Sequence, residues 1–517
     1  MSAIAWGFLL RLGQVCLEAA LTVAVGLFVA GTLRRMVGPA GTRHLFGRGF
    51  KGLVRGWLAG MLLPVCSLGV IPVAREMRRV GVPDGIVLSF ALAAPLLNPI
   101  SFLYGLTLAE PVVILTFAGL SLAVCTAAGW LWDRFFAGAG AAEATLRRAE
   151  AADAEPLPSA GPRRLLAVIA TAGSEFLGRD LRFYAAGVLA SAALAAAIPF
   201  GALQNTMKHT DATSPLLMAA VATPIFSSPL PGMMRIGLMF DHGNSIGAAF
   251  VLFLLGVGLS AGSILWLISD FGRRAALWLL AVFGLVLVVA YGCDRVLHDA
   301  RKAEIEHTHA FDDYSNPFPS DALAGSALVI TKLGEKFGPL EQVATGFLAG
   351  LALVGVAYRR GNRTGAIEAW LVRPTASRPR GRWDVELPRP LLGGVAILGL
   401  FAFAIAGAFV YYPDRAYCLD RMAAINAEAA VALRTGHAEQ AERHLEEWDL
   451  LARKLEVGTL LRSHAITGEQ SRSLEELREG LEVVRDLLRD GAPDEARKSF
   501  DTHVQEHYRA VKVSYRD

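Results

Sequence analysis

Apolar stretches long enough to cross a lipid bilayer recur along this chain of 517 residues. A helix needs about 20 predominantly apolar residues to span the hydrocarbon core of a membrane. The first stretch is too long for the apolar part of a signal peptide, and no small-residue cleavage site follows it. We therefore predict an all-α polytopic membrane protein with spans at residues 7–31, 85–107, 111–132, 183–200, 246–268, 275–291, 340–358 and 391–412.

Two further apolar stretches, residues 53–74 and 215–234, are interrupted by prolines. The first contains Pro64 and Pro72, and the second contains three prolines and a glycine within residues 224–232. Proline removes a backbone donor and clashes with the preceding turn, so neither stretch sustains a continuous helix. Irregular backbone at membrane depth persists only where protein or water satisfies its polar groups. We expect both stretches to be re-entrant hairpins or discontinuous helices that line a cavity.

The distribution of arginines predicts the topology, because basic loops face the cytoplasm. Arginine-rich loops follow the first span, the 53–74 stretch and several later spans, and they share one side only if both broken stretches enter and leave on one face. We therefore predict that the N-terminus and the C-terminal tail lie outside. The order span, broken element, span, span then occurs twice, the second time upside down. Two inverted repeats with broken helices are a recurrent transporter plan.

The repeat is weakly visible in the residues themselves. Residues 64–67 align with 224–227, and residues 85–88 align with 247–250. This register places Asn98 and Ser101 opposite Ser260 and Ser263.

Domain boundaries follow from these patterns and from the uneven distribution of charge. Only 19% of the residues are charged, against roughly 25% in soluble proteins, and they concentrate in the last hundred residues. Residues 137–162 are rich in Ala, Glu, Arg and Pro, which predicts a flexible cytoplasmic linker. Helical runs broken at Gly436, Gly468 and Gly491 predict a small soluble helical bundle. The expected order is a first repeat at 1–136, the linker, a second repeat at 163–292, an extracytoplasmic loop at 293–339, an accessory helix pair at 340–412 and the tail at 413–517.

Three separated motifs carry a family resemblance. Cys66-Ser67-Leu68-Gly69 leads to Pro72, Gly-Val-Pro-Asp-Gly follows at residues 81–85, and Pro-Leu-Leu-Asn-Pro follows at 95–99. Over residues 7–291 this resembles the family of predicted permeases that includes the organoarsenical efflux permeases. That family's signature is similar to Pro-x-Cys-Ser-Cys-Gly-x-x-Pro, then Gly-x-Pro-x-Gly, then Pro-x-x-Asn-Pro. The resemblance implies a permease of the plasma (inner) membrane that exports a small organometalloid or related toxic solute. Leu68 replaces the family's second cysteine, and residues 226–229 of the second repeat contain no cysteine. If the family grips a thiophilic metalloid through paired thiols, this chain lacks half of that grip, which leaves open a different substrate.

The candidate substrate-binding residues cluster at the helix breaks. Cys66 is either a soft ligand for metalloids or a small buried apolar residue. The serines either satisfy backbone groups that the breaks free or contact substrate. An amide at mid-span, as at Asn98, is costly unless it is paired, which favours a role in a site or in joining helices. The candidates are Cys66, Ser67, Gly69, Pro72, Asn98, Ser101, Ser227, Ser228 and Ser260.

Glu18 in the first span is a candidate proton-coupling carboxylate, because an acid at that depth suggests function. The alternative is that it pairs with Arg11 or reaches the membrane surface. His503 and His507 have the spacing of two metal ligands on a helix, but ordinary surface histidines are the favoured interpretation. We predict no metal site and no cofactor.

Other function classes have little support. No Walker A loop, GxSxG elbow, HExxH or dinucleotide fingerprint occurs, so the sequence predicts neither an enzyme nor an ATP-driven pump. A net charge of +3 does not suggest a nucleic-acid partner. The expected partners are a small-molecule or metalloid substrate and membrane lipid, and the oligomeric state stays open. The alternative function is a membrane-anchored sensor or assembly protein that acts through its extracytoplasmic tail.

Overall fold

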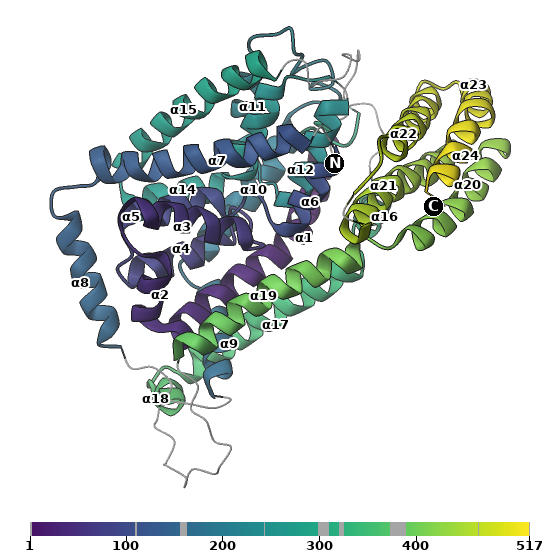
Figure 1. Ribbon diagram of the computed structural model, residues 1–517. Helices are drawn as coiled ribbons and strands as arrows, with labels where there is room; N and C mark the ends of the chain where they lie inside the picture. Colours follow the sequence, from purple (N-terminus) through teal and green to yellow (C-terminus); the bar gives the residue numbers. More distant parts are fainter. Residues whose placement is uncertain are drawn as a thin grey trace. The chain divides into compact units, whose positions relative to one another are not determined.

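The computed structural model describes residues 3–108, 111–155, 163–241, 243–297, 310–319, 325–372, 389–463 and 465–515 (Figure 1). The chain forms two compact units, one of residues 1–105 and 109–402 and one of residues 106–108 and 403–517, and each is described by itself. Within the described ranges the regular elements are all helical, apart from one isolated bridge between Lys208 and Asn244.

Helices long and apolar enough to cross a membrane dominate the larger unit. Four pass this test in the described residues: Ala3–Phe46, Val112–Phe136, Arg274–Val296 (α15) and Pro339–Gly361 (α17). The first combines α1 (Ala3–Thr32), a π-helical turn and α2 (Gly38–Phe46), and the second contains most of α7 (Pro111–Leu131). Two bent helix pairs raise the number to six if each pair is one span. The predicted all-α polytopic membrane class is confirmed.

Both proline-rich stretches are broken where the sequence predicts. Helix α3 (Gly49–Leu62) ends before Pro64, and α4 (Val70–Arg79) begins six residues after it. Helix α11 (Ser214–Ala222) likewise ends before Pro224, and α12 (Pro229–Asp241) follows. The prediction of broken helices at these positions is confirmed.

Two of the predicted spans are also broken, and the first of these breaks lies at Asn98 and Pro99, where a candidate residue was expected at a helix break. The 85–107 stretch divides into α5 (Asp84–Ala93) and α6 (Pro99–Leu108), because Pro99 lacks the N–H that would continue the helix. The 246–268 stretch divides into α13 (Ile246–Val251), extended by a π-helical turn to Val257, and α14 (Ala261–Phe271), with a bend of 59°. At this bend the N–H of Ala261, the first residue of α14, donates to the Pro224 carbonyl at 3.1 Å.

The two halves of the larger unit repeat the same local contacts. Asn98 and Ser101 exchange side-chain to backbone hydrogen bonds at the start of α6, and Ser260 and Ser263 form a capping box at the start of α14.

A second pair of equivalent contacts lies at the starts of the preceding helices. The carboxylate of Asp133 accepts from the Gly85 N–H at 2.9 Å, and that of Asp294 accepts from the Gly247 N–H at 2.8 Å. These matched caps support the register proposed for the repeat.

Two helices occupy segments for which we expected no packed helix. Helix α8 (Ala141–Asp153) lies within the range taken as a flexible linker, and Arg43 pairs with its Asp153 at 2.8 Å. Helix α9 (Arg163–Phe176) precedes α10 (Leu181–Ala197) at a bend of 54° and packs along α17 (Figure 1). Gly173 of α9 faces Gly355 of α17, which brings the two backbones into contact. The shorter α16 (Ser326–Glu335) packs on α1, and α18 (Ala366–Val372) packs on α9.

The smaller unit is a helical bundle with its own core. It comprises the end of α19 (Arg389–Tyr411), α20 (Arg415–Arg434), α21 (Ala438–Ser463), α22 (Gly468–Arg489), α23 (Pro493–Ser499) and α24 (Gln505–Ser514). Trp448 is fully buried and packs edge-on against Tyr508. Helices α20 and α22 end two residues before Gly436 and Gly491, whose backbones are left-handed, and Gly468 is the first residue of α22.

Candidate functional site

Breaks in helices from both repeats meet in the buried centre of the larger unit. Ser67, in the first break, donates through Oγ to Ser260 Oγ in the last break at 3.1 Å. The Pro224 carbonyl in the second proline-rich break accepts from the N–H of Ala261, the residue after Ser260. Both serine side chains are fully buried. The structure thus brings the breaks before α4, α12 and α14 into direct contact.

Cys66 lies at the start of this constellation and is fully buried. Its Sγ accepts from the Gly69 N–H at 3.3 Å. A Cβ on Gly69 would clash with the carbonyl oxygen of Thr22, so glycine here allows α1 to approach the break closely. The thiol therefore caps the first turn of α4, which is compatible with either the packing or the ligand interpretation.

Glu18 reaches the second proline-rich break instead of Arg11. Its Oε1 accepts from the Ser228 N–H at 2.6 Å, immediately before α12. The Phe226 N–H in the same break donates to Ser191 Oγ of α10 at 2.7 Å. Both acceptors satisfy backbone donors that the prolines have excluded from a helix. Glu18 therefore joins α1 of the first repeat to the break of the second.

Two arginines that our sequence analysis did not select occupy equivalent places after the two proline-rich breaks. The offset that relates Ser67 to Ser227 also relates Arg75 in α4 to Arg235 in α12. Arg235 donates through Nη1 to Ser227 Oγ at 2.7 Å, which ties it to the break itself. Extending the repeat register along these helices would have identified both arginines.

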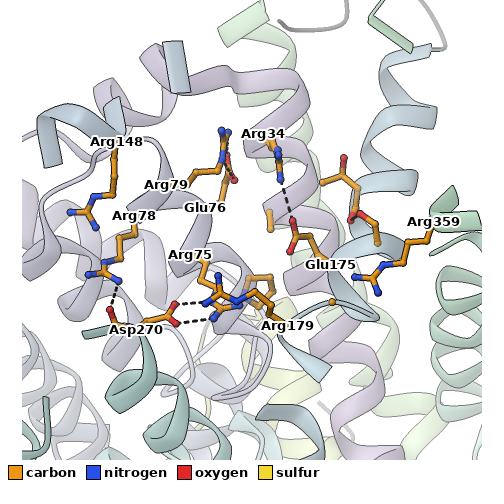
Figure 2. A pocket seen from close by; sticks show the side chains of 15 residues that line it. Arg34, Arg75, Glu76, Arg78, Arg79, Arg148, Glu175, Arg179, Asp270 and Arg359 are labelled. Carbon is orange, nitrogen blue, oxygen red and sulfur yellow. Dashed lines mark hydrogen bonds and ion pairs between the residues drawn. The ribbon is translucent and has the colours of Figure 1, made fainter. Parts of the chain in front are cut away.

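Arg75 forms ion pairs across the repeat boundary. Its guanidinium donates to both oxygens of Asp270 at 2.7 and 2.8 Å (Figure 2). It also pairs with Asp180. The side chain of Asp180 is 1% exposed. A carboxylate buried this deeply needs a hydrogen-bonded counter-charge, which Arg75 supplies. Helix α4 of the first repeat is thereby fastened to α10 and α14 of the second.

A polar cavity of about 500 Å³ opens above this ion pair (Figure 2). Arg34 contacts Glu175 at 3.1 Å across it, and Arg79 contacts Glu76 at 2.6 Å. The cavity reaches inward to Pro72, the last residue of the first motif. We call this region the basic end of the larger unit. The cavity is lined by Ala30, Arg34, Pro72, Arg75, Glu76, Arg78, Arg79, Arg148, Thr171, Ser174, Glu175, Gly178, Arg179, Asp270 and Arg359.

Arg235 lies at the other end, with Arg11 of α1. Both arginines contact the carboxylate of Asp313, at 3.0 and 3.2 Å. Arg11 and Ala30 belong to the same helix and are separated by about 28 Å along its axis, close to the thickness of a bilayer core. Arg75 and Arg235 therefore lie at opposite ends of the unit, as inversion of the two repeats requires.

The candidate residues fall into three places. The contacting breaks hold six of them: Cys66, Ser67, Gly69, Ser227, Ser228 and Ser260. Pro72 lines the basic-end cavity. Asn98 and Ser101 cap α6. The paired histidines of the tail are separate from these. His507 lies 3.5 Å from Glu476, and no cluster of three potential metal ligands occurs among the described residues.

The region that holds these helix breaks resembles known proteins in sequence. Residues 7–293 match the model of a family described as "Predicted permease", which covers more than half of the chain. The chain belongs to this predicted permease family. Over 88 residues it is also 31% identical to UPF0718 protein YcgR of Bacillus subtilis (strain 168), a match to 17% of this chain and 30% of that protein. The chain thus matches less than a third of the length of that relative. No solved structure matches the chain.

Proposed function

We propose that this member of the predicted permease family exports a small organometalloid or related toxic solute across the plasma (inner) membrane by alternating access. The observation that carries the proposal is the meeting of helix breaks from two inverted halves around Cys66, Ser67 and Ser260. Discontinuous helices at the repeat interface are where such transporters place their substrate. A protein that only anchored a tail in the membrane would not need these breaks.

The ion pairs at the two ends support alternating access. Arg75 closes α4 against Asp180 and Asp270 at the basic end, and Arg235 and Arg11 share Asp313 at the other. Each set joins parts of both repeats. Rocking one repeat against the other would break one set while the other stays closed. The arginine-rich loops assign the basic end to the cytoplasm.

Cys66 provides the test of the substrate class, because a thiol is the soft ligand that trivalent metalloids prefer. Everted vesicles carrying the protein should accumulate a trivalent methylarsenical, and Cys66→Ser should abolish this accumulation. The serine retains an acceptor for the Gly69 N–H, so the fold is preserved.

Cys125 of α7 is the matched control, because it is also a fully buried thiol but lies outside the breaks. Cys125→Ser should transport normally at equal amounts of protein. Unchanged transport by Cys66→Ser would make Cys66 a packing residue. Failure of the wild-type protein to accumulate any member of a metalloid panel would refute the substrate class.

The alternative function assigns the active role to the tail. Its support is that residues 403–517 form a compact unit with a separate buried core around Trp448. Vesicles containing a chain that ends after residue 412 distinguish the two functions. If the chain is a permease, the shortened protein should still transport solute. If it is a sensor or assembly protein, the tail carries the activity and the shortened protein should lose it.

A further inference from the structure

Arg11 and Arg235 form a buried cationic pair whose carboxylate partner comes from outside the matched family region. Each arginine side chain is only 8% exposed. Their shared partner, Asp313, belongs to residues 310–319, whereas the family match ends at residue 293. Both arginines therefore lie within the residues that match the family, whereas the carboxylate they share lies beyond that match.

The Asp313 carboxylate is held as a bound anion would be. Its Oδ1 lies 3.2 Å from Arg11 Nη1 and 3.6 Å from Lys336 Nζ, and its Oδ2 lies 3.0 Å from Arg235 Nη2. The Arg235 guanidinium also stacks 5.0 Å from the centre of the Tyr314 ring. Three cations thus surround one carboxylate, with the Ser227 hydroxyl of the helix break on the far side of Arg235.

The segment that carries Asp313 is anchored independently of this carboxylate. Asn316 donates through its backbone N–H to the Ile198 carbonyl at 2.8 Å and through Nδ2 to the Ala196 carbonyl at 3.0 Å. Arg11 donates to the carbonyl oxygens of Asp312 and Ser315. Loss of the Asp313 side chain should therefore empty the space between the arginines without releasing the backbone around it.

We propose that Arg11 and Arg235 form a binding site for a small carboxylate or oxyanion, and that Asp313 is a tethered occupant of that site. Two buried guanidinium groups require a counter-ion, since an unpaired buried charge is strongly destabilising. The planar fork of arginine suits the two oxygens of a carboxylate or oxyanion. Asp313, whose side chain is 41% exposed, meets most of this need when no solute anion is bound. The carboxylates of Asp312 near Arg11 and of Glu18 near Arg235 add weaker negative charge. This site is independent of the proposed metalloid transport, because it predicts anion binding by the purified protein.

Chemical rescue of Asp313→Ala tests the proposal. Removing the carboxylate should lower the melting temperature of the detergent-solubilised protein by at least about 5 °C. Formate should restore most of that loss, at constant ionic strength set with chloride. Half-maximal rescue should need millimolar formate or more, because a ligand of only three heavy atoms makes few contacts.

Three control variants identify the site. Asp313→Asn should lose stability but resist rescue, because its amide fills the space. The double variant Asp313→Ala with Arg235→Gln should also resist rescue. Glu143→Ala should behave as the wild-type protein, because its exposed pair with Arg147 contributes little. Equal formate effects in Asp313→Ala and in the double variant would overturn the proposal.

A measurement on the wild-type protein keeps the test decisive if Asp313→Ala does not fold. Carbon-13-labelled formate should compete with the tethered carboxylate, so its NMR line should broaden in the presence of the wild-type protein at constant ionic strength. Arg235→Gln should reduce this broadening, because it removes one of the two guanidinium groups. Equal line widths with the wild-type protein and with Arg235→Gln would overturn the proposal.

Discussion

Arg75 and Arg235 occupy equivalent positions after the two proline-rich breaks, yet they lie at opposite ends of α1 and pair with different acids. Arg75 meets Asp180 and Asp270, which belong to the opposite repeat. Arg235 meets Asp313, which lies beyond both repeats. The repeat therefore relates the two arginines to each other but does not relate the acids with which they pair. The two equivalent arginines belong to ion-pair sets whose acids come from different parts of the chain.

Replacing Arg75 should destabilise the permease body. Arg75→Gln leaves the carboxylates of Asp180 and Asp270 facing each other, with side chains 1% and 10% exposed. Removing one partner of a buried ion pair typically costs about 3–5 kcal/mol. Thermal denaturation in detergent should reveal the loss as a lower melting temperature. Arg147→Gln is the control, because its pair with Glu143 is highly exposed and contributes little. Equal melting temperatures for the two variants would contradict the assignment.

Glu18 variants separate proton coupling from capping. Glu18→Gln retains an oxygen acceptor for the Ser228 N–H, so its stability should remain near that of the wild type. Glu18→Ala removes the acceptor and should cost about 1–3 kcal/mol through the unsatisfied donor. If the carboxylate couples transport to protons, Glu18→Gln should lose accumulation driven by a pH gradient in vesicles. Wild-type accumulation in Glu18→Gln would leave Glu18 as a structural cap.

The contact between α9 and α17 should be sensitive to a single methyl group. A Cβ at Gly355 would clash with the Gly173 carbonyl, whereas a Cβ at Gly350 in the same helix meets nothing within 4 Å. Gly355→Ala should therefore cost about 1–3 kcal/mol through overpacking. Gly350→Ala should be neutral or slightly stabilising, since alanine favours helices. Melting temperatures of the two variants measure the difference, and a neutral Gly355→Ala would show that α17 is not held there.

Asp449 should give the tail a characteristic pH dependence. Burial alone would raise the pKa of Asp449, but Arg453 and Arg478, whose Nε atoms lie 3.2 and 2.9 Å from its oxygens, hold the pKa well below its usual range. A lowered folded-state pKa contributes stability that is complete above the unfolded value of about 3.9 and is lost as the pH falls through the folded value. Protection of α21 amides, corrected for intrinsic exchange, should stay constant from pH 7 to pH 5 and decline below about pH 4.

Asp449→Asn should lower this protection already at pH 7 and flatten its decline in acid. Glu439→Gln, at an exposed position near the start of the same helix, should retain the wild-type profile. If Asp449→Asn keeps the full acid-dependent decline, other carboxylates control the pH response of the tail.

Cysteine labelling tests the inverted topology. Ala151 in α8 is exposed at the basic end, and Ala212, whose carbonyl accepts from Tyr291, is exposed near the opposite end. In a Cys16→Ser background, an impermeant maleimide should label Ala212→Cys in intact cells and Ala151→Cys only after permeabilisation. Glu76 is buried in an ion pair with Arg79, so Ala151 is the better inside probe. Labelling of both sites from the same side would refute the inversion.

The sequence by itself determined where several helices stop. Pro64 and Pro224 interrupt their helices through their own missing donors, and Gly436 ends a tail helix through its left-handed backbone. These are local effects within a few residues, so the pattern reveals them without knowledge of the fold. The same reasoning explains why the bilayer-spanning character of the chain could be predicted from the length of its apolar stretches.

Tertiary structure alone decided the contacts that make these breaks a candidate site. The last break forms where the Ala261 N–H bonds to Pro224 on another helix, and an apolar pattern through residues 246–268 does not encode that partner. The Glu18 carboxylate accepts from the Ser228 N–H and does not pair with nearby Arg11. Arg11 instead pairs with Asp313, about three hundred residues away in the chain. Hydrogen-bonding groups need a partner in the membrane interior, but any suitable group satisfies them. Which one does so depends on how distant helices pack, and packing is settled only when the whole chain has folded.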